Sequence, residues 1–251
     1  MTVSRSARVW ELVAAEAASR DGQMSAVDAC VAAVAAIEVT GAWLSAANGA
    51  KSGHVLQVTD EVSEQLADLQ LTLGEGPCSD AVALGVPVLS SDLTEAEAVR
   101  CWPVFAPAAR QAGAAAIFAF PLRLGAIRAG VMCMYRETPG SLSDFQLGDA
   151  LVFADTATML LLDSADQAEG DLVAGSGPGG QPAELAIHRA EIDQATGMVT
   201  EQLGVGIAEA FVRLRAHAYA YDRRLGDLAR DIVARRVRLS PDLDVPEDFP
   251  V

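Results

Sequence analysis

The stretch that decides the fold of the C-terminal part covers residues 183–239 and reads AELAIHRAEIDQATGMVTEQLGVGIAEAFVRLRAHAYAYDRRLGDLARDIVARRVRL. It holds 9 of the chain's 18 basic residues but only 8 of its 34 acidic ones, which gives a net charge of +1. Residues 1–182 carry a net charge of −13, and the tail 240–251 carries −4. A change of charge of this size indicates a unit that meets a different partner from the rest of the chain.

Apolar residues in this stretch recur at helical spacing and predict three helices. The first is expected over 184–203, where Gly204 follows as a helix-ending glycine. The second is expected over 207–219, and the third over 223–238 with Asp222 as its cap. Helices this short cannot each bury an apolar face alone, so they are expected to pack as a three-helix bundle over 184–239.

A set of residues in this bundle occurs at the fixed spacing of a known family. The set is Ile192, Gln194-Ala195-Thr196-Gly197-Met198, Gly204, Ala210, Leu214-Arg215, Ala218, Leu225, Ala229 and Ile232-Val233. This pattern resembles the ANTAR family, whose members are small helical modules that bind RNA hairpins and switch transcription termination. The resemblance implies an ANTAR-like output unit whose partners are RNA hairpins.

The same resemblance points to particular recognition residues. It places Ala195, Thr196 and Gly197 in the RNA-binding surface together with Arg215, although the family usually has lysine at the position of Thr196. The remaining candidates are arginines near the junction of the second and third helices: Arg213, Arg223 and Arg224. The chain's only lysine is Lys51, so every arginine or lysine charge in the bundle is a planar guanidinium. Such groups bridge phosphates or stack on the unpaired bases of RNA loops.

An alternative function for the bundle is a protein–protein adaptor that only dimerises, because arginines on helix surfaces are usually solvated. Leu185, Ile192 and Val199 lie at seven-residue spacing with Ala195 between them, which suits an intersubunit seam. ANTAR relatives also imply two modules for two hairpins, so a homodimer is expected. A second apolar surface is predicted on a helix over 142–163, through Leu151, Phe153, Ala154, Ala157, Leu160 and Leu161.

Composition divides the rest of the chain into a large domain over 1–167, a linker and a tail. Residues 168–183 concentrate glycine and proline and predict a flexible linker. The acidic, proline-rich residues 240–251 predict a disordered tail. No apolar run of the sequence reaches the length of a membrane span, and the first residues lack a secretory core. A cytoplasmic protein with no membrane contact is therefore expected.

The pattern of residues 1–167 alternates strands with helices and predicts an α+β domain with an antiparallel sheet. Helices are expected over 6–19, 26–38, 61–72, 104–112 and 142–163. Strands are expected over 42–47, 54–59, 86–89, 115–122 and 129–135, and an irregular turn over 74–85.

Residues 40–165 carry a second family pattern. Its members are Leu73-Gly74-Glu75-Gly76-Pro77-Cys78, Ala81, Gly85, Val88, Asp92-Leu93, Trp102-Pro103-Val104-Phe105, Pro121-Leu122 and Gly130-Val131. This pattern resembles the GAF sensory domain, in the form found ahead of ANTAR in actinobacterial regulators. The resemblance implies a cavity between the sheet and its covering loops that binds a small-molecule ligand. The lysine motif of cyclic-nucleotide GAF domains is absent, and the negative charge of the unit favours a neutral or cationic ligand.

The side chains that could line such a cavity are mostly aromatic. They are Trp43, Cys78, Trp102, Phe105, Phe118 and Phe120. The competing interpretation, which we favour, is that these large side chains simply fill the core of a small α+β domain.

The four cysteines do not indicate a metal centre. Cys30, Cys78, Cys101 and Cys133 show no CxxC spacing and no paired histidines, so zinc and iron–sulfur sites are not expected. In a cytosolic protein they are expected to be reduced and buried. One class of GAF-fold protein, however, reduces free methionine sulfoxide with loop cysteines. A thiol enzyme or a Cys78–Cys101 redox switch is therefore the alternative for the front domain, and a Cα separation above about 7 Å would exclude that disulfide.

Phosphate-binding, dinucleotide-binding and serine-hydrolase motifs are all absent from the sequence, so no enzyme activity, cofactor or metal is expected. The expected protein is a cytoplasmic regulator in which a GAF sensor controls an ANTAR output that binds RNA. It would act as an antiterminator by holding one RNA fold and thereby preventing a competing terminator hairpin.

Overall fold

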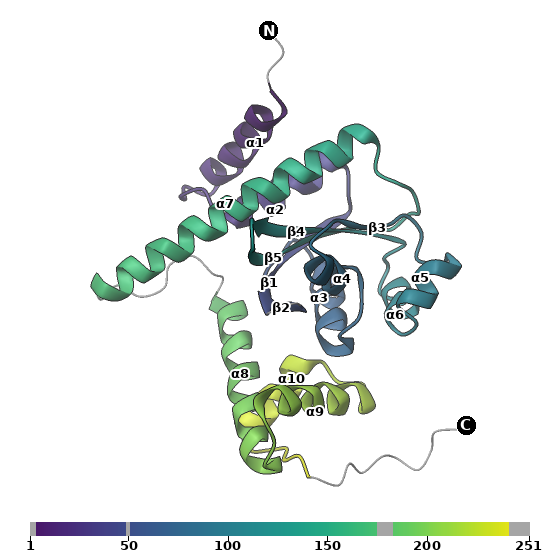
Figure 1. Cartoon of the computed structure of the whole chain (residues 1–251), viewed down its shortest axis with the longest axis vertical. Helices are drawn as coiled ribbons and strands as arrows, with labels where there is room; N and C mark the ends of the chain where they lie inside the picture. The colour runs from purple at the N-terminus through teal and green to yellow at the C-terminus, as the bar shows by residue number, and fades with distance from the viewer. Residues whose placement is uncertain (1–3, 49–50, 175–182, 241–251) are drawn as a thin grey trace. The chain divides into compact units, whose positions relative to one another are not determined.

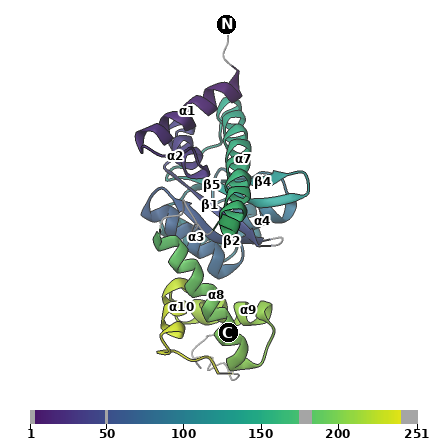
Figure 2. The ribbon, with the colours of Figure 1, turned by 90° about the vertical axis from the view of Figure 1, so that its left-hand side faces the viewer.

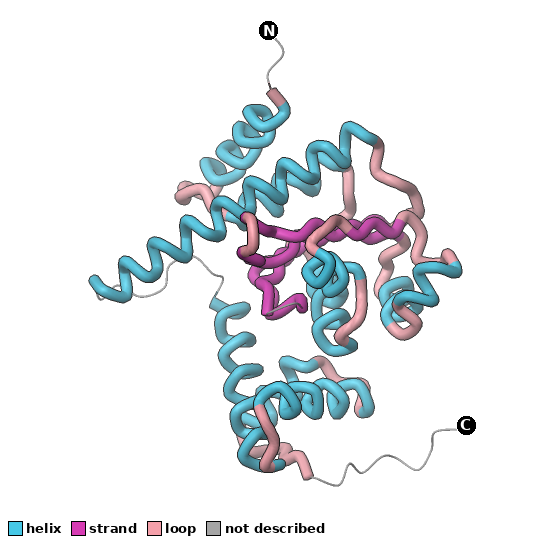
Figure 3. Tube along the Cα trace, in the orientation of Figure 1, coloured by secondary structure: helices cyan, strands magenta, loops and turns pink. Residues whose placement is uncertain are grey.

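The computed structural model describes residues 4–48, 51–174 and 183–240. Contacts divide the chain into two units, Met1–Pro182 and Ala183–Val251. Within the described residues, all five strands belong to the first unit, and the second contains helices (Figure 3). The predicted α+β class, with an antiparallel-sheet unit followed by a three-helix bundle, is confirmed.

The first unit is built on an antiparallel sheet with the strand order β2-β1-β5-β4-β3. The strands are β1 (Gly41–Asn48), β2 (Lys51–Val58), β3 (Val88–Ser90), β4 (Ala116–Leu124) and β5 (Ile127–Arg136). The register places Trp43 opposite Cys133 and Phe118 opposite Met134. Because strand side chains alternate between the two faces, this register sends Trp43 and Phe118 to opposite sides of the sheet.

Helices cover both faces of this sheet. One face is covered by α2 (Ala26–Ile37) and α7 (Asp144–Ala174), and α1 (Arg5–Ser19) packs on these two helices. The other face is covered by α3 (Glu61–Leu73), α4 (Pro77–Leu84), α5 (Ala96–Cys101) and α6 (Phe105–Gln111). In both ribbon views α2 and α7 run side by side (Figure 1 and Figure 2).

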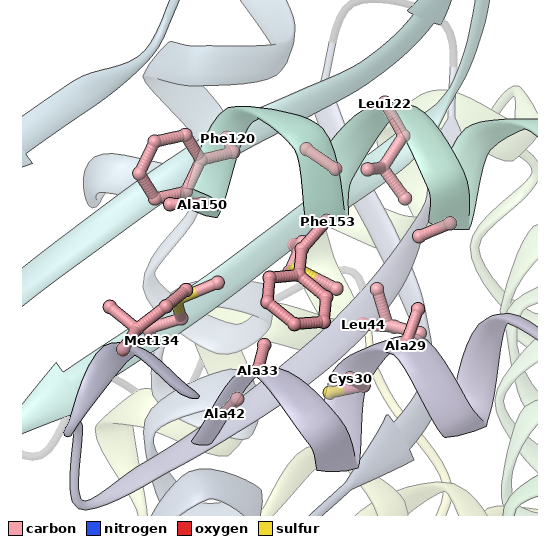
Figure 4. Packing of buried hydrophobic residues seen from close by; sticks show 14 of the residues in the cluster. Ala29, Cys30, Ala33, Ala42, Leu44, Phe120, Leu122, Met134, Ala150 and Phe153 are labelled. Atoms are coloured by element: carbon pink, nitrogen blue, oxygen red, sulfur yellow. The ribbon is translucent and has the colours of Figure 1, made fainter. Parts of the chain in front are cut away.

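The core under α2 and α7 shows how the sequence produces this packing. Phe153 of α7 lies between Phe120 of β4 and the alanines of α2 (Figure 4). Ala29 and Ala33 are fully buried, and their small side chains let α2 approach the sheet closely. Burial of a large apolar side chain such as Phe153 contributes roughly 1.5–3 kcal/mol.

The turn expected over 74–85 is helical for most of its length, so that prediction is wrong. Gly76 has φ +131°, and a Cβ at this position would lie 2.5 Å from the Gln70 side chain. Only glycine fits there. Pro77 then begins α4, and Gly85, with φ +70°, ends it. Proline at the first helical position and glycine after the last are favourable helix ends that outweighed the turn-like composition.

α1 is held against α7 by ion pairs to a buried carboxylate. Asp149 is 1 % exposed, and both Arg5, at 3.1 Å, and Arg8 bind it. On the neighbouring helix α2, Asp28 is fully buried and pairs with Arg20. Val9 and Val13 of α1 are fully buried beside these ion pairs.

α7 is longer and more apolar than we expected. Its Asp144–Ser164 part has a mean hydropathy of 1.3 and is long enough to cross a membrane, contrary to the sequence-based expectation. That window is 44 % buried inside the structure, and α7 packs on α2 and the sheet as a core helix does. Four of the six residues predicted to form a dimer surface are buried in this core: Phe153, Ala154, Ala157 and Leu160.

The predicted linker over 168–183 is also partly wrong, because α7 continues to Ala174. Residues 175–182 lie outside the described residues, as do residues 241–251 of the predicted tail. Glycine and proline begin to dominate only after Ala174, and the residues before it can continue the helix.

The second unit contains α8 (Ala183–Leu203), α9 (Ile207–Ala220) and α10 (Leu225–Val233). Gly204 ends α8 with φ +65°, as predicted. The third helix is shorter than predicted, because Arg224 and not Asp222 is its N-cap, and it ends at Val233. Asp222 instead adopts φ +47° in the preceding turn, a conformation that aspartate tolerates better than most residues. The helices pack through the fully buried Val199, Leu214, Leu228 and Ile232.

Candidate nucleic-acid interface

Charge is divided within the second unit as well as between the units. Residues 212–239 contain eight arginines and three aspartates, a net charge of +5. Residues 183–211 contain one arginine and five carboxylates, a net charge of −4. The α9–α10 part of the bundle is therefore the one that attracts a polyanion.

The small-residue turn of α8 is mostly inside the bundle. Ala195 is fully buried and Thr196 is 5 % exposed, while the Thr196 hydroxyl donates to the Ile192 carbonyl at 2.7 Å. Gly197 is exposed, and a Cβ there would meet nothing within 4 Å. The expectation that all three residues lie on a surface is therefore wrong for Ala195 and Thr196, and only Gly197 is exposed. Ala195 and Thr196 lie on the side of α8 that packs on its neighbours, as does Val199 one turn later.

The two candidate arginines of α9 have different surroundings. Arg213 donates to Glu209 at 3.1 Å, an ordinary pair one helical turn apart. Arg215 is half-buried, with its guanidinium carbon 5.8 Å from the centre of the Phe211 ring. This burial lowers the pKa of the Arg215 guanidinium from its usual value. Arg215 is thus a partly packed arginine, with its guanidinium beside the Phe211 ring.

Aromatic side chains gather at the end of α9, and sequence reasoning missed them. The His217 and Tyr221 rings stack with centroids 4.4 Å apart and an interplanar angle of 30°. Tyr219 is 54 % exposed and Tyr221 is 45 % exposed. Burial lowers the pKa of His217, so this ring is neutral at neutral pH. The available signal was that two of the chain's three tyrosines lie within three residues, next to arginines. Exposed aromatic rings are surfaces on which RNA bases stack.

A hollow of about 490 Å³ lies at the junction of α9 and α10. Charged residues line it: Asp222, Arg223, Arg224, Asp227, Arg230, Asp231 and Arg236. The two candidates Arg223 and Arg224 both line this hollow. Arg224 is exposed and makes no ion pair with the residues that the structure describes.

Asp231 organises one side of this hollow. It accepts from Arg223 at 2.5 Å and from Arg236 at 2.7 Å, although Arg223 precedes α10 and Arg236 follows it. These hydrogen bonds lower the pKa of the Asp231 carboxyl, with Arg223 as the first cause. Arg230 pairs with Asp227 at 2.9 Å and lies 3.5 Å from Glu191 of α8.

The six side chains proposed to line a ligand cavity in the first unit do not surround one space. All are at most 6 % exposed. Phe118 and Phe120 belong to the core under α2 and α7, on one face of the sheet. Trp43, Cys78, Trp102 and Phe105 belong to the core on the other face. The cavity assignment is therefore corrected, and the core interpretation describes these residues.

The cysteines pair differently from the predicted alternative. Cys78 of α4 is joined to Cys133 of β5 in a disulfide, with Cα atoms 6.5 Å apart. Cys101 is exposed and Cys30 is buried, and both are free. The Cys78–Cys101 switch is therefore not present, and the expectation of four reduced, buried thiols is wrong. The strand register explains the outcome, because Cys133 points from β5 into the same core as Cys78.

Within the residues that the structure describes, groups of three or more side chains able to hold a metal ion are absent. Gln70 is the polar neighbour of the disulfide: its amide oxygen accepts from the Cys78 N–H at 2.8 Å, and its amide nitrogen lies 3.1 Å from Cys78 Sγ.

Comparison with known proteins identifies a family for part of the second unit. Residues 186–233 match the family model of the ANTAR domain. Among curated proteins, no sequence matches the chain.

Solved structures similar to the chain include two GAF domains of phosphoenolpyruvate-protein phosphotransferases. The one from Coxiella burnetii has 11 % identity and a TM-score of 0.49, and the match covers 66 % of this chain and 99 % of that one. The one from Acinetobacter has 9 % identity and a TM-score of 0.47, covering 67 % and 99 %. The free methionine-R-sulfoxide reductase of Neisseria meningitidis has 12 % identity and a TM-score of 0.41, covering 66 % and 96 %. Residues 186–233 thus carry the ANTAR domain that the sequence predicts.

Proposed function

We propose that this protein is an RNA-binding antiterminator in which the GAF-like unit controls the ANTAR domain. The observation that carries the proposal is the ANTAR match over residues 186–233. RNA hairpins are the partners that ANTAR domains are generally known to bind, and a chain with a separate sensor-like unit has the parts of a regulator.

The surface of α9 and α10 supports this proposal physically. Residues 207–239, which run from the start of α9 to the segment after α10, combine a net charge of +4 with two exposed tyrosines and the arginine-lined hollow. Arginine forks bind phosphates, and aromatic faces stack on unpaired bases, which together suit a folded stem-loop. Binding of this kind needs no bond chemistry. The protein acts by stabilising one RNA fold, so that the competing terminator cannot form.

The experiment that tests this function is direct binding of the full chain to a pool of RNA stem-loops with randomised loops. We expect saturable binding to a subset of loops, and weaker binding to DNA hairpins of the same sequences. Arg215→Gln should weaken binding roughly 5- to 150-fold, the range for loss of a base or phosphate contact. Arg110→Gln is the matched control, because Arg110 is an exposed arginine of the first unit. Absence of any stem-loop binding would favour the adaptor function.

We also propose a homodimer, since the ANTAR resemblance implies two modules for two hairpins. The seam suggested on α8 does not support it, because Ala195 and Val199 are fully buried within one chain, and the side chain of Leu185 lies outside the described residues. The exposed apolar side chains of α7, Leu151 and Met159, are better placed for a partner. Light scattering of the full chain at micromolar concentration, with and without RNA, measures the mass directly.

A further inference from the structure

The arginines of the hollow between α9 and α10 are held in place by aspartates, unlike those of an ordinary charged surface. Its four arginines come from three places in the sequence: the turn before α10, α10 itself and the segment after it. Solvated arginines would repel one another and spread apart. Here Asp231 binds Arg223 and Arg236 together, and Asp227 holds Arg230. Three of the four guanidinium groups are therefore held around one space, and Arg224 is the fourth.

We propose that this hollow is a phosphate-binding subsite for the backbone of an RNA stem-loop, and that Asp231 is the residue that positions its arginines. The proposal rests on the proposed function, since it names the part of the RNA that this surface takes. The ligand is a phosphodiester group, bound through its two non-bridging oxygens.

Hydrogen-bond capacity supports this assignment. A guanidinium has five N–H donors, and Arg223 and Arg236 each use one of them in a hydrogen bond to Asp231. The remaining donors are available to a second acceptor. Arg224, which makes no ion pair within the described part of the chain, adds an uncompensated positive charge at the rim. Arginines that are already ordered lose less side-chain entropy when they bind, so the aspartate can increase affinity for an anion.

The carboxylates of the hollow allow a test in which charge and positioning predict opposite changes in RNA affinity. Three aspartates line the hollow, so the four arginines leave a net charge of only +1. If charge alone decided binding, removal of any carboxylate would tighten the complex with RNA. If Asp231 positions the arginines, its removal weakens the complex even though the protein becomes more positive.

The test uses the full chain and a stem-loop selected from the randomised pool by the wild-type protein. Asp231→Asn should weaken binding roughly fivefold, about the lower end of the range for one lost contact. The control is Glu201→Gln, which removes an exposed carboxylate of α8 elsewhere in the same unit and should not weaken binding. Ethylation of individual phosphates should identify at least one phosphate whose modification weakens binding by the wild type but not by Asp231→Asn.

A second variant tests the subsite even if Asp231→Asn fails to fold. Arg224→Gln changes an exposed side chain, and it should make the slope of log K against log salt shallower by about 0.7–0.9, the value for one phosphate contact. Tighter binding by Asp231→Asn, equal to that of Glu201→Gln, would overturn the subsite, as would an unchanged salt slope for Arg224→Gln. Failure of the wild type to bind any stem-loop is seen before any variant is made, and it overturns the proposed function and the subsite together.

Discussion

The two units use the same chemical pair, arginine with aspartate, in opposite ways. In the first unit the carboxylates are buried: Asp149 is 1 % exposed and Asp28 is fully buried, and their arginines attach α1 to the domain. In the ANTAR domain the central carboxylate, Asp231, is 25 % exposed, and its arginines remain open to solvent on one side. The two sets differ in the carboxylates and not in the arginines, because Arg5, Arg8 and Arg20 are 38–45 % exposed and Arg223 is 30 % exposed. We therefore predict a structural role for the buried carboxylates and a binding role for the arginines around Asp231.

Reduction of the disulfide should cause the largest loss of stability, and it should destabilise the first unit only. A link that closes a loop of 55 residues stabilises a domain by about 4 kcal/mol in the chain-entropy description. Urea unfolding with and without reductant should therefore shift the transition of the first unit and leave that of the ANTAR domain in place. Cys101→Ser is the control and should behave as wild type, because Cys101 is free and exposed. Equal stability in both conditions would show that the pair is not bonded in solution.

Loss of the buried ion pairs should have the next largest effect. Arg5→Ala with Arg8→Ala leaves Asp149 without its partners and should cost about 3 kcal/mol of the free energy of unfolding of the first unit. Arg100→Ala removes an exposed pair with Glu97 and should cost less than about 1 kcal/mol. Both can be measured by urea unfolding, and RNA affinity should be unchanged in either variant. Equal costs would remove the distinction between buried and exposed pairs.

Much of this architecture followed from the sequence, and the failures have identifiable physical causes. Periodicity located nearly every long helix and strand, and a glycine marked the end of α8. The α4 helix was missed because Gly76 and Pro77 resemble a turn in composition, although they are also favourable at a helix start. The recognition surface was only partly predictable. Whether Ala195 and Thr196 are buried depends on how α9 and α10 pack against α8. Asp231 joins Arg223 to Arg236 only after folding.

A matched pair of lysine substitutions on α8 should have an intermediate effect. Thr196→Lys places a charge at a buried position and should destabilise the ANTAR domain by about 1–3 kcal/mol. Gly197→Lys replaces an exposed helical glycine and should stabilise the domain by about 0.5–1 kcal/mol. Thermal unfolding of both variants measures the difference. A Thr196→Lys domain as stable as wild type would mean that this turn faces solvent after all.

The smallest expected effect is the pH dependence from His217. Burial lowers the pKa of His217 below its usual value of 6.5, so the unfolded chain takes up the proton first as pH falls. The resulting stability is fully present above about pH 6.5 and is lost as pH decreases toward the folded-state pKa. The midpoint of thermal unfolding of the ANTAR domain should therefore be lower at about pH 5.5 than at about pH 7.5, and His217→Gln should reduce this difference. An unchanged difference in the variant would assign the pH effect to other groups.

The central claim is that RNA contacts the ANTAR domain and not the front unit. Ultraviolet cross-linking of a selected stem-loop to the full chain, followed by mass spectrometry of the attached peptides, tests it most directly. We predict cross-links within residues 190–239, with Tyr219 and Tyr221 among the attached residues because their exposed rings can stack on bases. Cross-links concentrated in the first unit, or none above those of an unselected stem-loop, would contradict the account.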